Sequence, residues 1–216
     1  MRPTVFGMVD GLVSNFALIA GVAAASNTAK PVVVAGVAGL FAGAFSMGTG
    51  EYVSVRSQNE SMQAEVEVER AELRHNPEAE LEELTQLYIN RGVDPELAQL
   101  VAEQLSVDPT QALEIHAQEE LGVDIYDLPD PRVAAVSSFL AFSVGAFLPL
   151  APFLFASHVL VLAAVLSLVG LFVTGALTSR FTIRSWVYTG SRQMVLGALT
   201  FAVTFGVGHL IGANIS

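Results

Sequence analysis

Five long apolar runs decide what kind of protein this sequence can form. They cover residues 5–25, 31–55, 133–151, 159–178 and 194–211. A transmembrane helix needs about 20 predominantly apolar residues, and only helices or closed barrels satisfy their backbone hydrogen bonds inside a bilayer. The sequence therefore predicts an all-α, polytopic membrane protein with five transmembrane helices. The first run is not expected to be a cleaved signal peptide, because it contains Asp10 and Arg2 alone supplies a basic leader.

Acidic residues are concentrated in one block between the second and third runs. Nineteen of the 21 Asp and Glu residues lie within 57–130, and with three arginines they give this block a formal charge of −16. Such a block repels nucleic acid and attracts cations. We therefore predict three parts: transmembrane helices 1 and 2 (residues 1–56), an acidic helical insert (57–130) and transmembrane helices 3 to 5 (131–216), with no nucleic-acid partner.

Lys and Arg residues are distributed unevenly between the two sides of the predicted membrane protein. If the five spans alternate in direction, nine basic residues fall on the side of the insert and one, Lys30, falls on the other. Because basic residues favour the cytoplasmic side, we expect the N-terminus and the insert to be cytoplasmic. The C-terminus would then lie outside the cell or in a lumen.

The insert is predicted to be helical and not a disordered acidic tail. The second span continues without a helix breaker as far as Asn76, which indicates one long helix that leaves the membrane. Pro77 can then begin a second helix, with Gly92 just after its end. Asp94 and Asp108 each precede a proline, which is the pattern of an N-cap followed by Pro at the first helical position. Two further short helices are therefore expected.

Two carboxylates lie within the predicted spans, Asp10 in the first and Glu51 in the second. An ionisable group in a span costs about 2.5–3.5 kcal/mol on insertion scales and usually faces a cavity or a partner. With a rise of about 1.5 Å per residue, Asp10 and Met47 should lie at a similar depth, and Glu51 about one turn nearer the cytoplasm. Gly39 and Gly43 precede Met47 and Glu51 at four-residue spacing, which lets helices approach closely.

This stripe predicts a tight helix interface that opens into a cation site. Two alternatives stay open. Glu51 could lie at the membrane surface with its carboxylate reaching water, and Met47 alone could be a filler of the apolar core.

Several ligand-type side chains in the insert share single helix faces. These sets are Glu65, Glu69 and Glu72 on the long helix, Glu80 and Glu83 on the next, and His116 and Glu120 on the last. Carboxylates at this spacing repel one another unless they are solvated or bridged by a cation. Carboxylate oxygens with an imidazole suit Fe²⁺, Mn²⁺ or Zn²⁺. The alternative is a set of solvated acidic faces without metal.

Enzymatic chemistry is not indicated. Residues 72–75 match the Glu-x-x-His pair of di-iron carboxylate bundles, but the sequence has no second copy. It also contains no cysteine, Gly-rich phosphate loop, nucleophile elbow or HExxH motif. We predict a protein that is not an enzyme and has no prosthetic group.

Three segments resemble the vacuolar iron transporter family. They are RPTVFGMVDGLVSNFALIAGVAAA (residues 2–25), GAFSMGTGEYVSVRSQNE (43–60) and HAQEELGVD (116–124). The expected topology is similar too, with a charged helical insert between the second and third spans. The resemblance covers essentially the whole chain and favours a prokaryotic-type member with a cytoplasmic metal-binding domain.

The resemblance implies a homodimer with an iron path along its interface. The family's translocation residues match Asp10, Met47 and Glu51. Its cytoplasmic metal-binding glutamates match, by position, Glu69, Glu72, Glu80, Glu83 and Glu120. The resemblance also implies an antiport that exchanges Fe²⁺ for protons and moves iron out of the cytosol.

The chain departs from the family in the last insert helix. A plant-type member has Met and an adjacent Glu where this chain has His116 and Ala117. Nitrogen then replaces sulfur and one carboxylate is missing, so the metal preference stays open. Because the unperturbed pKa is about 6.5 for His and about 4.3 for Glu, we expect His116 to dominate the loss of metal affinity between about pH 7 and 5.5.

The predicted function is proton-coupled Fe²⁺ transport out of the cytosol, with a glutamate-rich cytoplasmic domain that captures the ion. A Mn²⁺-preferring or broad divalent-metal transporter is the alternative of the same fold. A non-transporting membrane metal sensor or storage protein is the alternative from another class, although it needs no carboxylates inside its spans. A prokaryotic inner membrane is favoured over a vacuolar membrane. The expected partners are a second copy, divalent metal ions, protons and the lipid bilayer.

Overall fold

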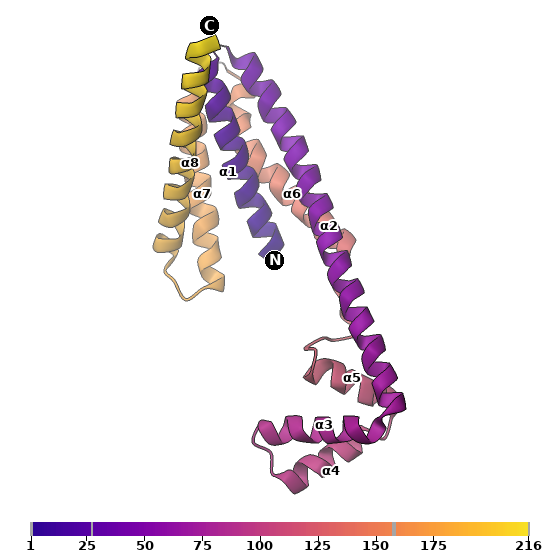
Figure 1. Cartoon of the computed structure of the whole chain (residues 1–216). Coiled ribbons are helices and arrows are strands. Elements are labelled where there is room, and N and C mark those ends of the chain that lie inside the picture. Colours follow the sequence, from indigo (N-terminus) through magenta and orange to yellow (C-terminus); the bar gives the residue numbers. More distant parts are fainter. Residues whose placement is uncertain (1, 27, 157–158, 216) are drawn as a thin grey trace. The chain divides into compact units, whose positions relative to one another are not determined.

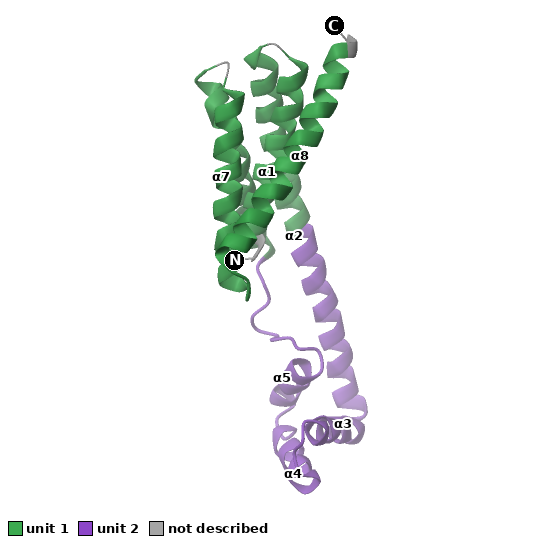
Figure 2. Ribbon diagram, turned by 90° about the vertical axis from the view of Figure 1, so that its left-hand side faces the viewer, with its two compact units in different colours: residues 1–52, 131–216 green, residues 53–130 purple. Residues whose placement is uncertain are grey.

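The computed structural model describes residues 2–26, 28–156 and 159–215. Within these ranges the regular secondary structure is helical, and five helices are long and apolar enough to cross a membrane. The prediction of an all-α, polytopic membrane protein is therefore confirmed. The chain forms two compact units, one of Met1–Tyr52 with Pro131–Ser216 and one of Val53–Asp130 (Figure 2). We call them the membrane unit and the insert unit.

The membrane unit contains the five candidate transmembrane helices (Figure 1). They are α1 (Arg2–Ala25), the first part of α2 (Ala29–His75), α6 (Pro131–Leu150), α7 (Leu160–Thr178) and α8 (Trp186–Ile215). Short 3-10 turns follow α6 and α7, at Ala151–Leu154 and Ser179–Phe181. The last helix begins at Trp186 and not at residue 194, because its first two turns are too polar to be part of an apolar run but still continue the helix.

Helix α1 packs against α6, α7 and α8 and supplies much of the core of the membrane unit. Its side chains Leu12, Phe16 and Ile19 are almost fully buried. Phe16 stacks on Phe201 of α8 with 4.7 Å between the ring centroids. Gly145 lets α6 cross α1 closely, since a Cβ atom there would overlap the backbone of Met8.

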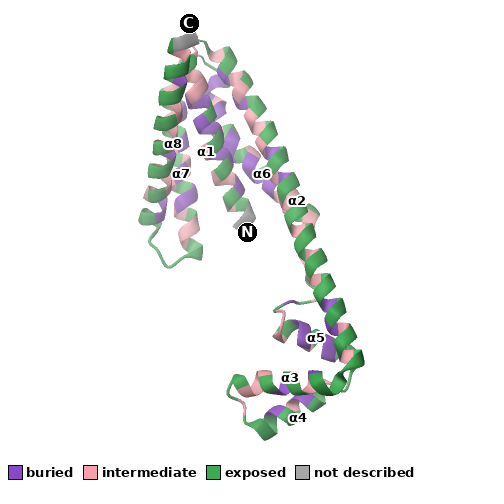
Figure 3. Ribbon diagram, viewed as in Figure 1, coloured by how far each residue is buried: buried purple, intermediate pink, exposed green. Residues whose placement is uncertain are grey.

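Many large apolar residues of the membrane unit are exposed, and Figure 3 shows exposed residues in green along the outward faces of its helices. The most apolar stretch of α1 is 44% buried, whereas that of α2 is 22% buried and that of α8 only 11%. Large exposed apolar faces mark contact with lipid or with another protein. The faces of α2 and α8 are therefore available for such contacts.

The insert unit contains the end of α2 and three shorter helices. These are α3 (Pro77–Asn90), α4 (Pro95–Leu105) and α5 (Pro109–Glu119). The predicted capping is confirmed: the carboxylates of Asp94 and Asp108 accept backbone N–H groups at the starts of α4 and α5, and Gly92 follows α3 with a positive φ of 92°. Val66 of α2 packs against Leu113 and Ala117 of α5, which holds α5 on the long helix.

Candidate metal sites

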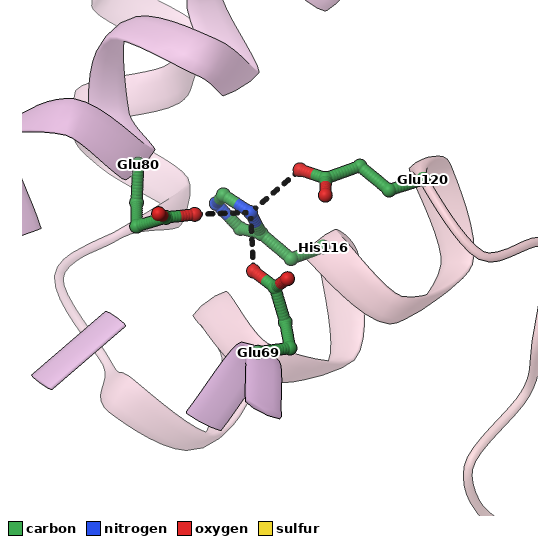
Figure 4. Close-up of side chains that lie close together, drawn as sticks. All are labelled: Glu69, Glu80, His116 and Glu120. Atoms are coloured by element: carbon green, nitrogen blue, oxygen red, sulfur yellow. Dashed lines mark hydrogen bonds and ion pairs between the residues drawn. The ribbon is translucent and has the colours of Figure 1, made fainter. Parts of the chain in front are cut away.

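Four side chains from three helices converge inside the insert unit (Figure 4). Glu69 comes from α2, Glu80 from α3, His116 from α5, and Glu120 directly follows α5. Their potential ligand atoms all lie within 4.8 Å of one another. We call this group the four-residue cluster.

The imidazole of His116 lies at the centre of the three carboxylates. Its Nδ1 atom is 2.9 Å from Glu120 Oε1, 3.0 Å from Glu69 Oε1 and 3.7 Å from Glu80 Oε2. His116 is fully buried, and Glu69 and Glu80 are 6% and 7% exposed. One Nδ1–H group cannot satisfy three carboxylates. Because buried carboxylates are costly when unpaired, the cluster requires additional protons or a cation.

The acid–base properties of the cluster reflect this crowding. Burial raises the pKa of Glu69 to about 7, and the charge of Glu120 contributes next. Burial likewise raises the pKa of Glu120 to about 7, with a further contribution from the charge of Glu83. The pKa of Glu80 is raised mainly by burial, whereas His116 acts in the opposite direction. Near neutral pH, protons therefore compete with a metal ion for these carboxylate oxygen atoms.

The structure brings together only part of the glutamate set that the sequence suggested. Glu72 and Glu83 are exposed and lie outside the four-residue cluster, but their charges still raise the pKa of Glu120. Glu65 is also exposed. The ring of His75 contacts the carbonyl of Ala71, 2.6 Å away, and it belongs to no potential metal group among the described residues.

The expected pH dependence requires a correction. The sequence assigned the loss of metal affinity between about pH 7 and 5.5 to His116, with the glutamates titrating near 4.3. Burial instead raises the pKa values of Glu69 and Glu120 to about 7. Sequence spacing does not reveal this shift, because it depends on how far the packed helices exclude water.

Metal binding to the insert unit is therefore expected to weaken as the pH falls through 7. Protons and a divalent cation compete for the same oxygens, so each ligand that must lose a proton changes the affinity by about tenfold per pH unit. Isothermal titration with Mn²⁺ between pH 8 and 6 measures this slope. A His116→Met variant should keep most of it. A flat titration for that variant would show that His116, and not the glutamates, controls the proton competition.

A second set of ligand-type side chains lines a pocket of about 520 Å³ in the membrane unit. Asp10, Ser14 and Asn15 come from α1, and Met47 and Glu51 come from α2. The structure thus places all three residues of the expected transport path at one pocket. Asp10 is exposed, and Met47 and Glu51 are partly buried, so the pocket opens onto the surface of the single chain.

The glycine stripe of α2 also borders this pocket. Gly39 lies against Leu18 and Asn15 of α1, and Gly43 lies against the ring of Phe142 of α6. Sequence reasoning did not identify Phe142, because an apolar residue in an apolar span carries no pattern that distinguishes it. Its 4% exposure and its position beside Gly43 make it one wall of the pocket.

Comparison with known proteins connects these two sites to one family. The VIT family model matches residues 1–209. A vacuolar iron transporter of Acanthamoeba castellanii is 40% identical, over 97% of this chain and 78% of the relative. Vacuolar iron transporter 1 proteins of Tulipa gesneriana and Arabidopsis thaliana are each 30% identical over 98% of this chain, and the matches cover 87% and 86% of those relatives.

These relatives are named as transporters and not as enzymes, in agreement with the prediction that the chain is not an enzyme. The match extends from the first transmembrane helix through the insert unit and into α8. It therefore includes both sets of ligand-type side chains. The chain belongs to the VIT family.

Proposed function

We propose that this protein transports divalent iron across a membrane. The observation that carries the proposal is the meeting of Asp10, Met47 and Glu51 at one pocket of the membrane unit. Carboxylates inside spans are retained mainly where they serve an ion path or pair with a partner. The relatives named as iron transporters favour Fe²⁺ as the cargo.

In this proposal the insert unit captures the ion. The four-residue cluster offers three carboxylates and one imidazole, a donor set that suits Fe²⁺ and other borderline divalent ions. Glu72 and Glu83 are exposed near the cluster and would attract or transfer cations at its edge. A net charge of −16 over residues 57–130 raises the local concentration of cations.

The pocket in the membrane unit then conducts the ion. Glu51 lies closest to the insert along α2, and Met47 follows one turn deeper. A carboxylate attracts the cation, while a thioether adds a softer ligand that favours iron over calcium or magnesium. Asp10 on α1 completes the set, and protonation of the carboxylates after the ion leaves would couple iron movement to protons in the opposite direction.

The path is proposed to be complete only in a homodimer. Asp10 is exposed in the single chain although it lies within a transmembrane helix. A charged side chain at such a depth needs a partner, a bound cation or water. A second copy packed over this pocket would supply the opposite wall and a second Asp10.

The distribution of basic residues favours an orientation with the N-terminus and the insert in the cytoplasm. Iron would then move from the cytosol to the exterior or to a lumen. We favour the inner membrane of a prokaryotic cell over a vacuolar membrane as its location.

A non-transporting sensor or storage protein would use the four-residue cluster but would have no need for the pocket around Asp10.

Metal flux into proteoliposomes tests this function. The purified protein should take up Fe²⁺ faster than protein-free vesicles do, and Mn²⁺ should compete as the principal alternative substrate. Stronger competition by Mn²⁺ than by unlabelled Fe²⁺ would favour the manganese-preferring or broad alternative. Metal binding without any flux would favour the sensor or storage protein.

Gly39→Ala is expected to lower flux substantially without preventing metal capture. A Cβ atom at this position would lie 2.5 Å from Leu18 Cδ2 and 2.9 Å from Asn15 Oδ1, so it would narrow the pocket between α1 and α2. Flux and insert-unit binding can be measured on the same preparation. Gly206→Ala is a matched control, because Gly206 lies on α8 outside the pocket and a Cβ atom there meets no neighbouring atom within 4 Å. Equal flux in both variants would contradict the assigned path.

A further inference from the structure

The amide nitrogen of Asn15 makes a hydrogen bond, whereas the amide oxygen makes none within the described residues. Asn15 is 2% exposed on α1, and its Nδ2 group donates a 2.6 Å hydrogen bond to the carbonyl of Ala146 on α6. A carbonyl oxygen can only accept hydrogen bonds, so it must face the amide nitrogen of Asn15. This contact fixes the orientation of the amide and turns Oδ1 away from α6.

The free oxygen of the amide lies beside Gly39 of α2, at the edge of the pocket. Asn15 Oδ1 is buried and has no hydrogen-bond partner among the described residues. Asn15 also lines the pocket that contains Asp10. The residue opposite Oδ1 is Gly39, where a Cβ atom would lie only 2.9 Å from this oxygen. Gly39 also lines the pocket and has no side chain, so only its backbone separates this part of the pocket from the oxygen.

We propose that Asn15 Oδ1 is a ligand for the transported divalent cation, one step beyond Asp10. The inference rests on the proposed function, because it assigns a further contact along the same path. Asn15 lies about 7.5 Å farther along α1 than Asp10, at about 1.5 Å per residue. It contacts either the ion itself or one of the water molecules bound to the ion.

A neutral oxygen has a specific use at this position. An ion must bind strongly enough to enter a path and weakly enough to leave it. A third carboxylate would bind the cation too strongly for it to leave. An amide oxygen instead replaces part of the cation's hydration shell without adding charge. The amide oxygen is also a hard ligand, in contrast to the soft sulfur of Met47. Asn15 would therefore help to set which divalent ions pass.

A purely structural role explains only half of this geometry. The bond from Nδ2 to Ala146 joins α1 to α6, as polar side chains often do between transmembrane helices. Such a role does not require a buried oxygen without a partner, and unpaired buried acceptors are unfavourable. The cation supplies the partner that the protein itself lacks at this point.

The test compares two metals in the same proteoliposomes, Mn²⁺ as the harder ion and Zn²⁺ as the softer one. Asn15→Leu removes the oxygen but keeps a side chain of similar size, and it should lower the ratio of Mn²⁺ flux to Zn²⁺ flux by about tenfold, as loss of a supporting metal contact typically does. Asn15→Asp keeps an oxygen at this position, so it should not lower the ratio. Asn15→Ala provides a second truncation if the leucine variant does not fold.

Ser138→Ala is the matched control. Ser138 lies on α6, is fully buried and has a hydroxyl without a hydrogen-bond partner in the described chain, but it does not line the pocket. Its substitution should leave the flux ratio unchanged. An unchanged ratio in Asn15→Leu, or an equal loss of Mn²⁺ and Zn²⁺ flux, would overturn the ligand assignment. Asp10→Ala in the same assay separates the two proposals: full flux in that variant would refute the path itself.

Discussion

Asp10→Ala is expected to reduce divalent metal flux by about 100-fold while leaving the protein folded. Asp10 is the only acidic residue of α1, and it is exposed at the pocket that also contains Met47 and Glu51. Loss of a supporting contact at a metal site typically costs about 10- to 100-fold in affinity or activity, and loss of a charged ligand should reach the upper end of that range. Fe²⁺ flux into proteoliposomes measures the loss.

Two further variants define what the charge of Asp10 contributes. Asp10→Asn keeps the shape of the side chain and should lose nearly as much flux as alanine does. Ser14→Ala changes a polar neighbour on the same pocket wall and should have a much smaller effect. Size-exclusion chromatography checks that each variant is folded. Wild-type flux in Asp10→Ala would place the path elsewhere in the membrane unit.

The second large effect is expected in the insert unit. The combined change Glu69→Gln, Glu80→Gln and Glu120→Gln removes all three carboxylates of the four-residue cluster. Metal affinity should fall by at least about 100-fold, because ligand removal at a metal site costs more than the loss of a supporting contact. Flux should fall at low Fe²⁺ concentration and recover at high concentration, since the pocket in the membrane unit is unchanged.

A charge-matched control separates ligation from general attraction. Glu65→Gln, Glu78→Gln and Glu114→Gln remove the same number of charges from exposed positions of α2, α3 and α5. If the cluster binds metal as proposed, this variant keeps nearly all of its affinity. Equal losses in the two triple variants would mean that the insert unit only attracts cations through its charge.

The same triple cluster variant should also change the stability of the metal-free insert unit. Carboxylates whose pKa is raised by folding stabilise the folded state below their unfolded pKa of about 4.3, and this contribution is lost as the pH rises through the folded pKa of about 7. Above pH 7 their ionised forms therefore destabilise the unit. Hydrogen exchange of peptides from residues 57–130 should show greater protection in the glutamine variant than in the wild type at pH 8 without metal.

Much of the fold could be predicted from the sequence because its signals are local. Apolar runs mark the spans, and Asp94 and Asp108 before prolines mark the starts of α4 and α5. The absence of a breaker before Asn76 predicted the full length of α2, which ends at His75. Each of these features depends on residues within a few positions of one another.

The membership of the metal site depends on tertiary packing and could be predicted only in part. Spacing along the sequence indicated three groups of ligand-type residues, and the four that the structure brings together, Glu69, Glu80, His116 and Glu120, are among them. It could not separate them from Glu72 and Glu83, which are equally acidic and lie close in sequence. Only the way α2, α3 and α5 pack together decides which carboxylates reach His116 (Figure 4).

The residues of the pocket in the membrane unit could likewise be predicted only in part from the sequence. Helical depth and spacing indicated Asp10, Met47 and Glu51, which all line it. The wall formed by Phe142 and the free oxygen of Asn15 depend on how α1, α2 and α6 cross. No periodic pattern along a single helix contains that information.

The proposed exchange of iron for protons at the pocket around Asp10 predicts that Fe²⁺ uptake depends on a pH gradient. Fe²⁺ uptake is followed in proteoliposomes whose lumen is either at the same pH as the outside or more acidic, with Asp10→Ala vesicles as the reference. We expect the acidic lumen to accelerate Fe²⁺ uptake by the wild type and the luminal pH to rise as iron enters, with neither change in Asp10→Ala. Iron uptake that is independent of the pH gradient, or a response to the gradient that persists in Asp10→Ala, would contradict proton exchange at this pocket.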